Sequence, residues 1–183
     1  MIRPRFGTLR GLVRLALSYP QLFLGLGAGR PVDPATVRRL VFVCQGNICR
    51  SAFAESAARR AGLRAASLGL STTPGRPAHP PAIKAAQALG NDLQAHRATD
   101  LADYQPQPGD LLLAMEVRQL GRLAADPRLR DVPRALLGRW TRPMMPHLHD
   151  PYGLDDRYMA RCLARIDRAV ARLALSFPGA RLS

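Results

Sequence analysis

The chain is poor in cysteine and contains no long apolar run. Its three cysteines, an odd number among 183 residues, argue against a disulfide scaffold and indicate a reducing compartment, so we expect a cytoplasmic protein. No stretch of about 18 uncharged apolar residues is present, which argues against a helix that spans a membrane. The hydrophobic fraction of 47% is that of an ordinary globular protein, and the length suffices for one domain with its own core.

Lysine is nearly absent, since Lys84 is the only one, yet arginine brings the net charge to +14. An RNA-binding signature, a helix-turn-helix pattern and interleaved aromatic residues are all lacking, so we expect no nucleic-acid partner. Two interpretations of the charge stay open. The basic surface is either merely solvated, or it attracts anionic substrates or an anionic membrane surface.

Residues 1–38 differ from the rest of the chain. Four arginines precede an uncharged stretch over residues 15–29, which Pro20 interrupts. These arginines are Arg3, Arg5, Arg10 and Arg14. We expect an N-terminal extension with a short amphipathic helix that either packs on the domain or contacts a membrane surface. A secretory signal is the less favoured alternative, because Pro20 breaks the apolar stretch.

From residue 39 onward, strand-like and helix-like segments alternate. Strands are predicted over 40–43, 66–70, 111–115 and, more weakly, 132–137; helices are predicted over 51–61, 82–89, 116–125 and 155–175. This alternation predicts an α/β fold, with a parallel sheet covered by helices on both faces. We therefore expect a single domain over 39–183, with ligands bound beyond the carboxyl ends of the strands.

The first predicted strand ends in Cys44, and Arg50 follows six residues later at the start of a helix. This spacing alone is weak evidence, because Cys162 and Arg168 repeat it. Those two residues lie in a helical stretch, where positions six apart point in different directions. A loop between a strand and a helix instead directs backbone N–H groups and the positive helix end toward one point, where a phosphate dianion can bind.

Cysteine and arginine in such a loop point to phosphate-ester chemistry. Arg50 can grip two phosphate oxygens, and the positive field favours the thiolate of Cys44, which is the form that attacks phosphorus. We predict a phosphatase without a metal or cofactor. The phosphate-binding residues are Gln45, Gly46, Asn47, Ile48, Cys49, Arg50 and Ser51.

A thiol phosphatase also needs an acid, which protonates the leaving oxygen and then activates water. Asp150 is the candidate, because Pro151 stiffens its loop, although an Asp-Pro pair taken alone more often forms just a turn. Tyr152 is placed to line the entrance and stack on an aryl ring. His147 and His149 flank the acid, and they either tune Asp150 or, as the favoured interpretation, are solvated loop histidines.

The segment over 44–51 and the Asp-Pro-Tyr sequence at 150–152 together resemble the low-molecular-weight protein tyrosine phosphatase family. The resemblance covers residue 39 to the C-terminus. It implies a four-stranded parallel sheet flanked by helices, the absence of a metal, and a cysteinyl-phosphate intermediate. By position, Cys44 is the nucleophile, Arg50 the phosphate-gripping arginine and Asp150 the general acid.

The resemblance also implies a hydrogen-bond network that braces the loop. Its members are Asn47, Ser51, Ser67 and His96. Alternatives stay open for two of them, because Ser51 is equally a simple helix cap and His96 an ordinary surface or capping histidine. Cys49 matches a position that forms a reversible disulfide with the nucleophile under oxidation. It otherwise packs inward as a small apolar residue.

Residues 71–77 carry no aromatic side chain, although relatives active on phosphotyrosine often place one there. Selectivity for phosphotyrosine over other aryl phosphates therefore stays open, and we expect the substrate to be a phosphotyrosine-containing protein or a small aryl phosphate. Two further hypotheses are an arsenate reductase of the same fold and a phosphate-binding module without turnover. Against the arsenate reductase, the chain has no cysteine between Cys49 and Cys162 that could resolve an arsenylated nucleophile. A partner tyrosine kinase is permitted by the resemblance.

Overall fold

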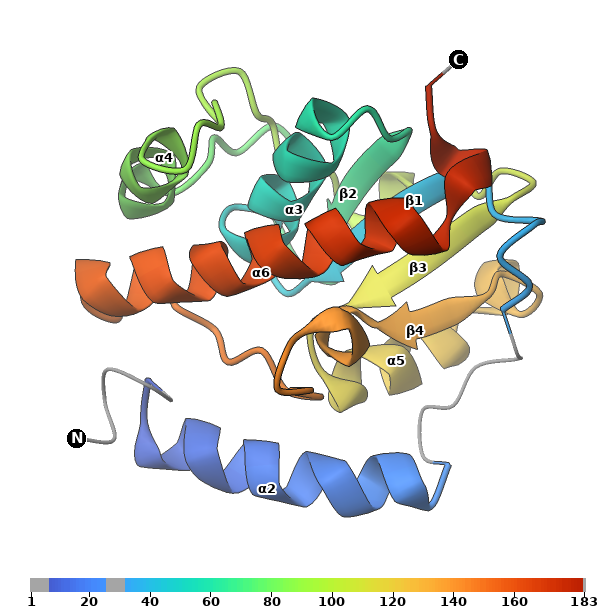
Figure 1. Ribbon diagram of the computed structural model, residues 1–183, viewed down its shortest axis with the longest axis horizontal. Helices are drawn as coiled ribbons and strands as arrows, with labels where there is room; N and C mark the ends of the chain where they lie inside the picture. Colours follow the sequence, from blue (N-terminus) through green and yellow to red (C-terminus); the bar gives the residue numbers. More distant parts are fainter. Residues whose placement is uncertain (1–6, 26–31, 183) are drawn as a thin grey trace.

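The computed structural model describes residues 7–25 and 32–182. Its centre is a parallel sheet of four strands in the order β2-β1-β3-β4 (Figure 1). The strands are β1 (Arg39–Cys44), β2 (Ala65–Gly69), β3 (Asp110–Ala114) and β4 (Arg134–Leu136). The predicted four-stranded parallel sheet is confirmed, and the weakest predicted strand, over 132–137, is also the shortest.

Helices cover both faces of the sheet, as predicted. They are α3 (Arg50–Arg60), α4 (Pro80–Gln87), α5 (Val117–Ala124) and α6 (Asp156–Ser176). Single 3-10 turns lie at Leu101–Asp103, Pro127–Leu129, Leu137–Trp140 and Pro178–Ala180. In Figure 1, α6 crosses the sheet beside α3, while α5 lies on the opposite side.

After Arg39, the central strand β1 is apolar from Leu40 to Cys44 because these residues are buried on both faces of the sheet. Side chains alternate along a strand, so Phe42 and Cys44 join the core beneath α3, α4 and α6. Val41 and Val43 point the other way, into the core beneath α5. A continuous run of buried residues thus places Cys44 at the carboxyl edge of the sheet.

The N-terminal part contains helix α2 (Leu9–Phe23). The side chain of Thr8 caps it by accepting the N–H of Gly11 at 2.9 Å. Pro20 lies inside this helix and does not end it. Leu15 and Ser18 are buried where α2 packs on the domain, and α2 contacts α5. Arg3, Arg5 and residues 26–31 lie outside the described residues.

No helix within residues 7–25 and 32–182 is both long and apolar enough to cross a membrane.

Candidate active site

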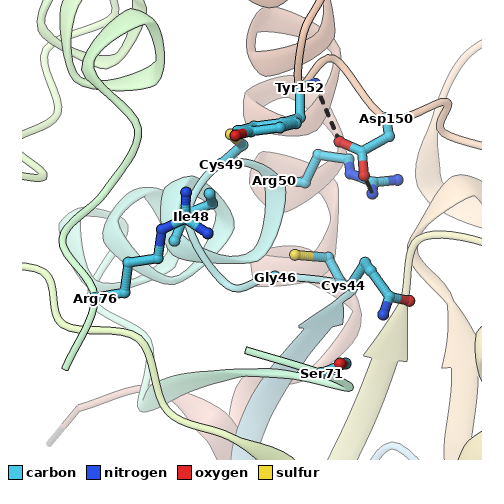
Figure 2. Close-up of a pocket in the computed structure, with 10 residues that line it drawn as sticks. Cys44, Gly46, Ile48, Cys49, Arg50, Ser71, Arg76, Asp150 and Tyr152 are labelled. Atoms are coloured by element: carbon cyan, nitrogen blue, oxygen red, sulfur yellow. Dashed lines mark hydrogen bonds and ion pairs between the residues drawn. The ribbon is translucent and has the colours of Figure 1, made fainter. Parts of the chain in front are cut away.

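A pocket opens at the carboxyl edge of the sheet, beside the loop that joins β1 to α3. The strand order reverses direction between β1 and β3, and such switch points are where open α/β sheets bind ligands. The pocket encloses about 220 Å³. Its lining residues are Cys44, Gln45, Gly46, Ile48, Cys49, Arg50, Ser71, Arg76, Asp150 and Tyr152 (Figure 2). The three predicted catalytic residues are therefore brought together, although β1 is far in sequence from residues 147–152, the acid loop, which carries Asp150.

The sulfur of Cys44 is held by two hydrogen-bonding groups. Its Sγ lies 3.0 Å from Oγ of Ser51 and accepts the backbone N–H of Asn47 at 3.3 Å. The side chain of Ser51 makes no helix cap, because Cys49 occupies the N-cap position of α3. The interpretation of Ser51 as a simple cap is therefore wrong. Both groups are placed to stabilise negative charge on the sulfur.

Asn47 connects the loop to the rest of the domain. Its backbone φ is +51°, a left-handed conformation that asparagine tolerates better than most residues. Its amide Nδ2 donates to Ser51 at 2.9 Å and to Ser67 at 2.7 Å, and Nε2 of His96 lies 2.7 Å from its carbonyl oxygen. The predicted bracing residues thus form one network, and His96 is more than a surface histidine. Ser67 further donates to Glu55 at 2.5 Å, a contact that the sequence analysis did not foresee.

Arg50 is almost completely buried, with a relative exposure of 1%. Its Nη1 donates to Glu116 and to the carbonyl oxygen of Leu148, both at 2.8 Å, while Nη2 lies 2.5 Å from Oδ2 of Asp150. Burial opposes the charged form, but the negative charges of Asp150, Cys44 and Glu116 outweigh it and raise the pKa of Arg50. Nε has no hydrogen-bond partner among the described residues. A bound oxyanion can supply that partner.

Glu116 is a functional residue that the sequence analysis missed, having treated it only as the start of a helix. It is buried and accepts from Arg50 at 2.8 Å and from Arg118 at 2.6 Å. Burial by itself raises the pKa of Glu116, but the two guanidinium groups prevail and hold it at about 2. An acidic residue directly after a buried strand, at the edge where ligands bind, was the available signal.

Asp150 both forms a turn and faces the pocket, so the two interpretations of its Asp-Pro sequence, a turn and a general acid, are compatible. Its Oδ1 accepts the N–H of Tyr152 at 3.2 Å, which closes a turn of the Asx type. Its other oxygen contacts Arg50 at the pocket (Figure 2), and 35% of the side chain is exposed. The carboxylate can therefore reach both solvent and a bound ligand.

The acid loop is more buried than predicted. His147 has a relative exposure of 5%, and its Nδ1 lies 3.6 Å from a Glu116 oxygen. Burial lowers the pKa of His147 to about 4 and also lowers that of His149. The interpretation of these two histidines as solvated loop residues is wrong, because α2 and α6 pack against the loop.

The outer wall of the pocket contains one aromatic residue, Tyr152, whose ring centroid lies 4.9 Å from that of His79. The opposite wall is formed by Ser71 and Arg76, within the segment that lacks aromatic residues. Arg76 was not predicted, since nothing in its local sequence links it to the loop at 44–51. It adds a positive charge at the rim of the pocket.

The remaining thiols differ in position. Cys49 lines the pocket together with Cys44, and burial raises its pKa. Cys162 lies in the core on α6, with a relative exposure of 2%, while Arg168 on the same helix is exposed. The second cysteine–arginine pair therefore forms no site, as predicted. Within the described part of the chain, no group of three or more His, Cys, Asp or Glu side chains is arranged to hold a metal ion.

Known proteins resemble this chain in sequence and in fold. A family model described as low molecular weight phosphotyrosine protein phosphatase matches residues 39–182. The chain is 31% identical over 138 residues to Wzb of Escherichia coli K12, a low molecular weight protein-tyrosine-phosphatase, covering 74% of this chain and 92% of Wzb. It is 36% identical over 81 residues to EpsP of Ralstonia solanacearum, a probable low molecular weight protein-tyrosine-phosphatase. That alignment covers 43% of this chain and spans 56% of EpsP.

A solved structure agrees with these relatives. Wzb of Vibrio vulnificus, in complex with benzylphosphonate, superimposes with a TM-score of 0.66 at 26% identity, covering 76% of this chain and 98% of that one. Helix α2 precedes the residues that the family model matches. The predicted resemblance is confirmed from residue 39 onward, and the chain belongs to the low molecular weight phosphotyrosine protein phosphatase family.

Proposed function

We propose that the protein hydrolyses phosphotyrosine, or another aryl phosphate monoester, through a cysteinyl-phosphate intermediate. One observation carries this proposal: the pocket places Cys44, a buried arginine with a free Nε–H group, and a solvent-accessible carboxylate around one anion-sized space. Nucleophile, phosphate-binding group and acid are the three groups that the reaction requires.

The first step transfers the phosphoryl group to sulfur. Backbone N–H groups of residues 45–50 and the guanidinium of Arg50 bind the phosphate oxygens, and the phosphate takes the place of Asp150 beside Arg50. The thiolate of Cys44 attacks phosphorus, an S–P bond forms, and the bond to the ester oxygen breaks. Asp150 gives its proton to that oxygen, so the alcohol or phenol leaves neutral.

The second step regenerates the enzyme. A water molecule loses a proton to the Asp150 carboxylate and attacks phosphorus, while the S–P bond breaks and inorganic phosphate forms. The departing sulfur of Cys44 becomes a thiolate again, and Ser51 is within 3.0 Å to donate a hydrogen bond to it. Asn47 and its partners keep the loop in the shape that both steps need.

An aryl substrate fits the single aromatic wall. Tyr152 is half exposed at the rim, where a phenyl ring attached to a bound phosphate can stack on it. The benzylphosphonate bound by Vibrio vulnificus Wzb is an analogue of this class. Arg76 on the other wall favours substrates with negative charge beside the phosphate.

Two other hypotheses have less support. An arsenate reductase needs a further thiol beyond the loop that carries Cys44 and Cys49, and the remaining cysteine, Cys162, is buried in the core. A binding module without turnover has no use for the Asp150 carboxylate at the pocket. Neither hypothesis gains a specific observation from the structure.

Cys49 is proposed to protect the nucleophile. When peroxide oxidises the Cys44 thiolate to a sulfenic acid, attack by Cys49 forms a disulfide and releases water. Dithiothreitol should then restore the activity of the wild type after peroxide treatment, whereas Cys49→Ser should lose it irreversibly. Cys162→Ser is the matched control and should behave like the wild type. Equal recovery in all three proteins would contradict the role.

We further propose a cytoplasmic enzyme whose N-terminal part contacts an anionic membrane surface. On α2, an apolar face opposite the domain leaves Leu9, Val13 and Leu17 between 48% and 66% exposed. These residues are four apart and therefore share one side of the helix. Arg10 and Arg14 flank them, and no acidic residue lies on α2. Such a face suits anionic lipid.

For the protein substrate, we propose a tyrosine kinase that carries phosphotyrosine.

The membrane proposal is tested by flotation with vesicles. The full chain should float with vesicles that contain anionic lipid but not with neutral ones, and replacing Val13 and Leu17 by serine should abolish flotation. Dimerisation of the wild type that the same substitutions remove would instead assign this face to a second copy of the chain.

The phosphatase proposal is tested by assaying the purified full chain on aryl, alkyl and acyl phosphates, with Cys44→Ser as the control. Turnover of p-nitrophenyl phosphate that vanadate inhibits and EDTA does not is the expected result. Absence of turnover, or equal turnover by the control, would overturn the proposal.

A further inference from the structure

The start of the N-terminal helix contacts the loop that carries the acid. Oγ1 of Thr8 lies 3.1 Å from Nε2 of His149, the residue immediately before Asp150. Burial lowers the pKa of His149, so its ring is neutral near pH 7. In the tautomer with the proton on Nδ1, the free Nε2 accepts the Thr8 hydroxyl. The lone pairs of the same hydroxyl remain available to cap α2 through the N–H of Gly11.

Gly7 packs tightly at the same point. It is buried and has a φ of +77°, a conformation that other residues rarely adopt. A Cβ atom at this position would lie 2.6 Å from Cδ2 of His149, 2.9 Å from Cζ of Tyr158 and 3.0 Å from Cδ1 of Leu154. Only glycine lets the chain approach the acid loop this closely.

His149 is also held from the side of α6. The ring of Tyr158 meets its ring edge-on, with 6.1 Å between the centroids. Sγ of Cys162 lies 3.8 Å from its carbonyl oxygen. The side chain and the backbone of His149 are thus fixed by two different helices. Asp150, in contrast, is partly exposed and is bound within the site by Arg50, a contact that phosphate displaces in the proposed mechanism.

We propose that Gly7 and Thr8 are positioning residues for the general acid, acting through His149 to keep Asp150 over the pocket once phosphate has taken its place beside Arg50. Fixing the residue before Asp150 restricts the directions in which the carboxylate can point. Proton transfer needs the acid within hydrogen-bond reach of the leaving oxygen. The inference rests on the proposed function, and it assigns a catalytic use to residues outside the family match.

The experiment compares two substrates that differ only in how much they need an acid. Phenyl phosphate has a poor leaving group, whereas p-nitrophenyl phosphate has a good one. In the full chain, Thr8→Val keeps the shape of the side chain but removes the hydroxyl. We expect it to lower kcat/KM for phenyl phosphate about fivefold, the effect of one lost hydrogen bond. The value for p-nitrophenyl phosphate should fall by much less.

Three further variants complete the test. Thr8→Ser restores the hydroxyl and should restore kcat/KM for phenyl phosphate, while Gly7→Ala should reproduce the selective loss through its clash with His149. Thr36→Val is the matched control, because the hydroxyl of Thr36 donates, among the described residues, only to the exposed carbonyl of Asp33. It should leave both substrates unaffected. Circular dichroism verifies that each variant is folded.

The outcomes separate the inference from the proposed function. If the wild type fails to hydrolyse either substrate, the proposed function fails. If the wild type is active but Thr8→Val and Gly7→Ala leave both substrates unchanged, or slow both equally, the positioning role is refuted. A selective loss on phenyl phosphate that Thr8→Ser reverses supports it.

Discussion

Replacing Asp150 with asparagine separates two effects of one carboxylate. Asparagine keeps the size of the side chain and can still accept the N–H of Tyr152, which in the wild type lies 3.2 Å from Oδ1. It cannot donate a proton to a leaving oxygen, and it removes the charge 2.5 Å from Nη2 of Arg50. We therefore expect catalysis and phosphate affinity to change in opposite directions.

The size of each effect follows from the site. Loss of a general acid typically costs a factor of about 10² to 10⁴, and the whole factor applies only where the leaving group needs protonation. The carboxylate of Asp150 is 35% exposed, so water screens its attraction to Arg50. A pair of this kind contributes about 1 kcal/mol, so a phosphate that no longer displaces it should bind roughly fivefold more tightly.

The assay measures kcat/KM for phenyl and p-nitrophenyl phosphate, together with the inhibition constant of inorganic phosphate. Asp156→Asn is the matched control, because this exposed carboxylate lies 3.6 Å from Lys84 and does not line the pocket. The control should change neither quantity. An equal loss on both substrates would rule out the acid role. Weaker inhibition by phosphate would refute the competition between Asp150 and the ligand for Arg50.

Three other variants test the rest of the site. Cys44→Ser should abolish turnover but retain phosphate binding, measured by calorimetry; residual turnover would assign the nucleophile elsewhere. Glu116→Gln leaves Arg50 buried without one of its two carboxylate partners, so unfolding by urea should show a loss of about 3 kcal/mol at pH 7. Since the pKa of Glu116 falls from 4.5 to about 2 on folding, this advantage exists above pH 4.5 and vanishes as the pH drops through 2. A gap that persisted below pH 2 would contradict it. Asn47→Ala removes the donor that binds Ser51 and Ser67; it should lower kcat/KM at least tenfold, about 1.4 kcal/mol, and normal kinetics would show the network to be dispensable.

The sequence could predict the parts of the site that are contiguous. The loop from Cys44 to Ser51 is read directly, because a buried strand, a turn and a helix follow one another without interruption. Asp150 was found by asking what the cysteine chemistry requires, and the family resemblance then supplied Ser67 and His96. The alternating pattern also placed all four strands to within two residues.

Residues that act through tertiary contacts escaped prediction. Glu116 follows β3 and Arg76 follows β2. Both reach the site only because these strands are parallel to β1 and end at the same edge of the sheet. Burial of His147 depends on the packing of other elements against the acid loop, and no local pattern encodes that. The contact of Thr8 with His149 spans 141 positions. Such contacts follow from the assembled fold and not from any local stretch of sequence.

Because the Nε–H group of Arg50 can bind an oxyanion, the free energy of unfolding should depend on the concentration of such an anion in the buffer. Any tetrahedral oxyanion that occupies this position binds the folded chain and has no matching site on an unfolded one, so mass action adds its binding energy to the folding equilibrium. At a hundredfold excess over its dissociation constant, the gain is about 2.7 kcal/mol. Under the proposed function, the phosphate released by turnover inhibits the enzyme and stabilises its folded state at the same time.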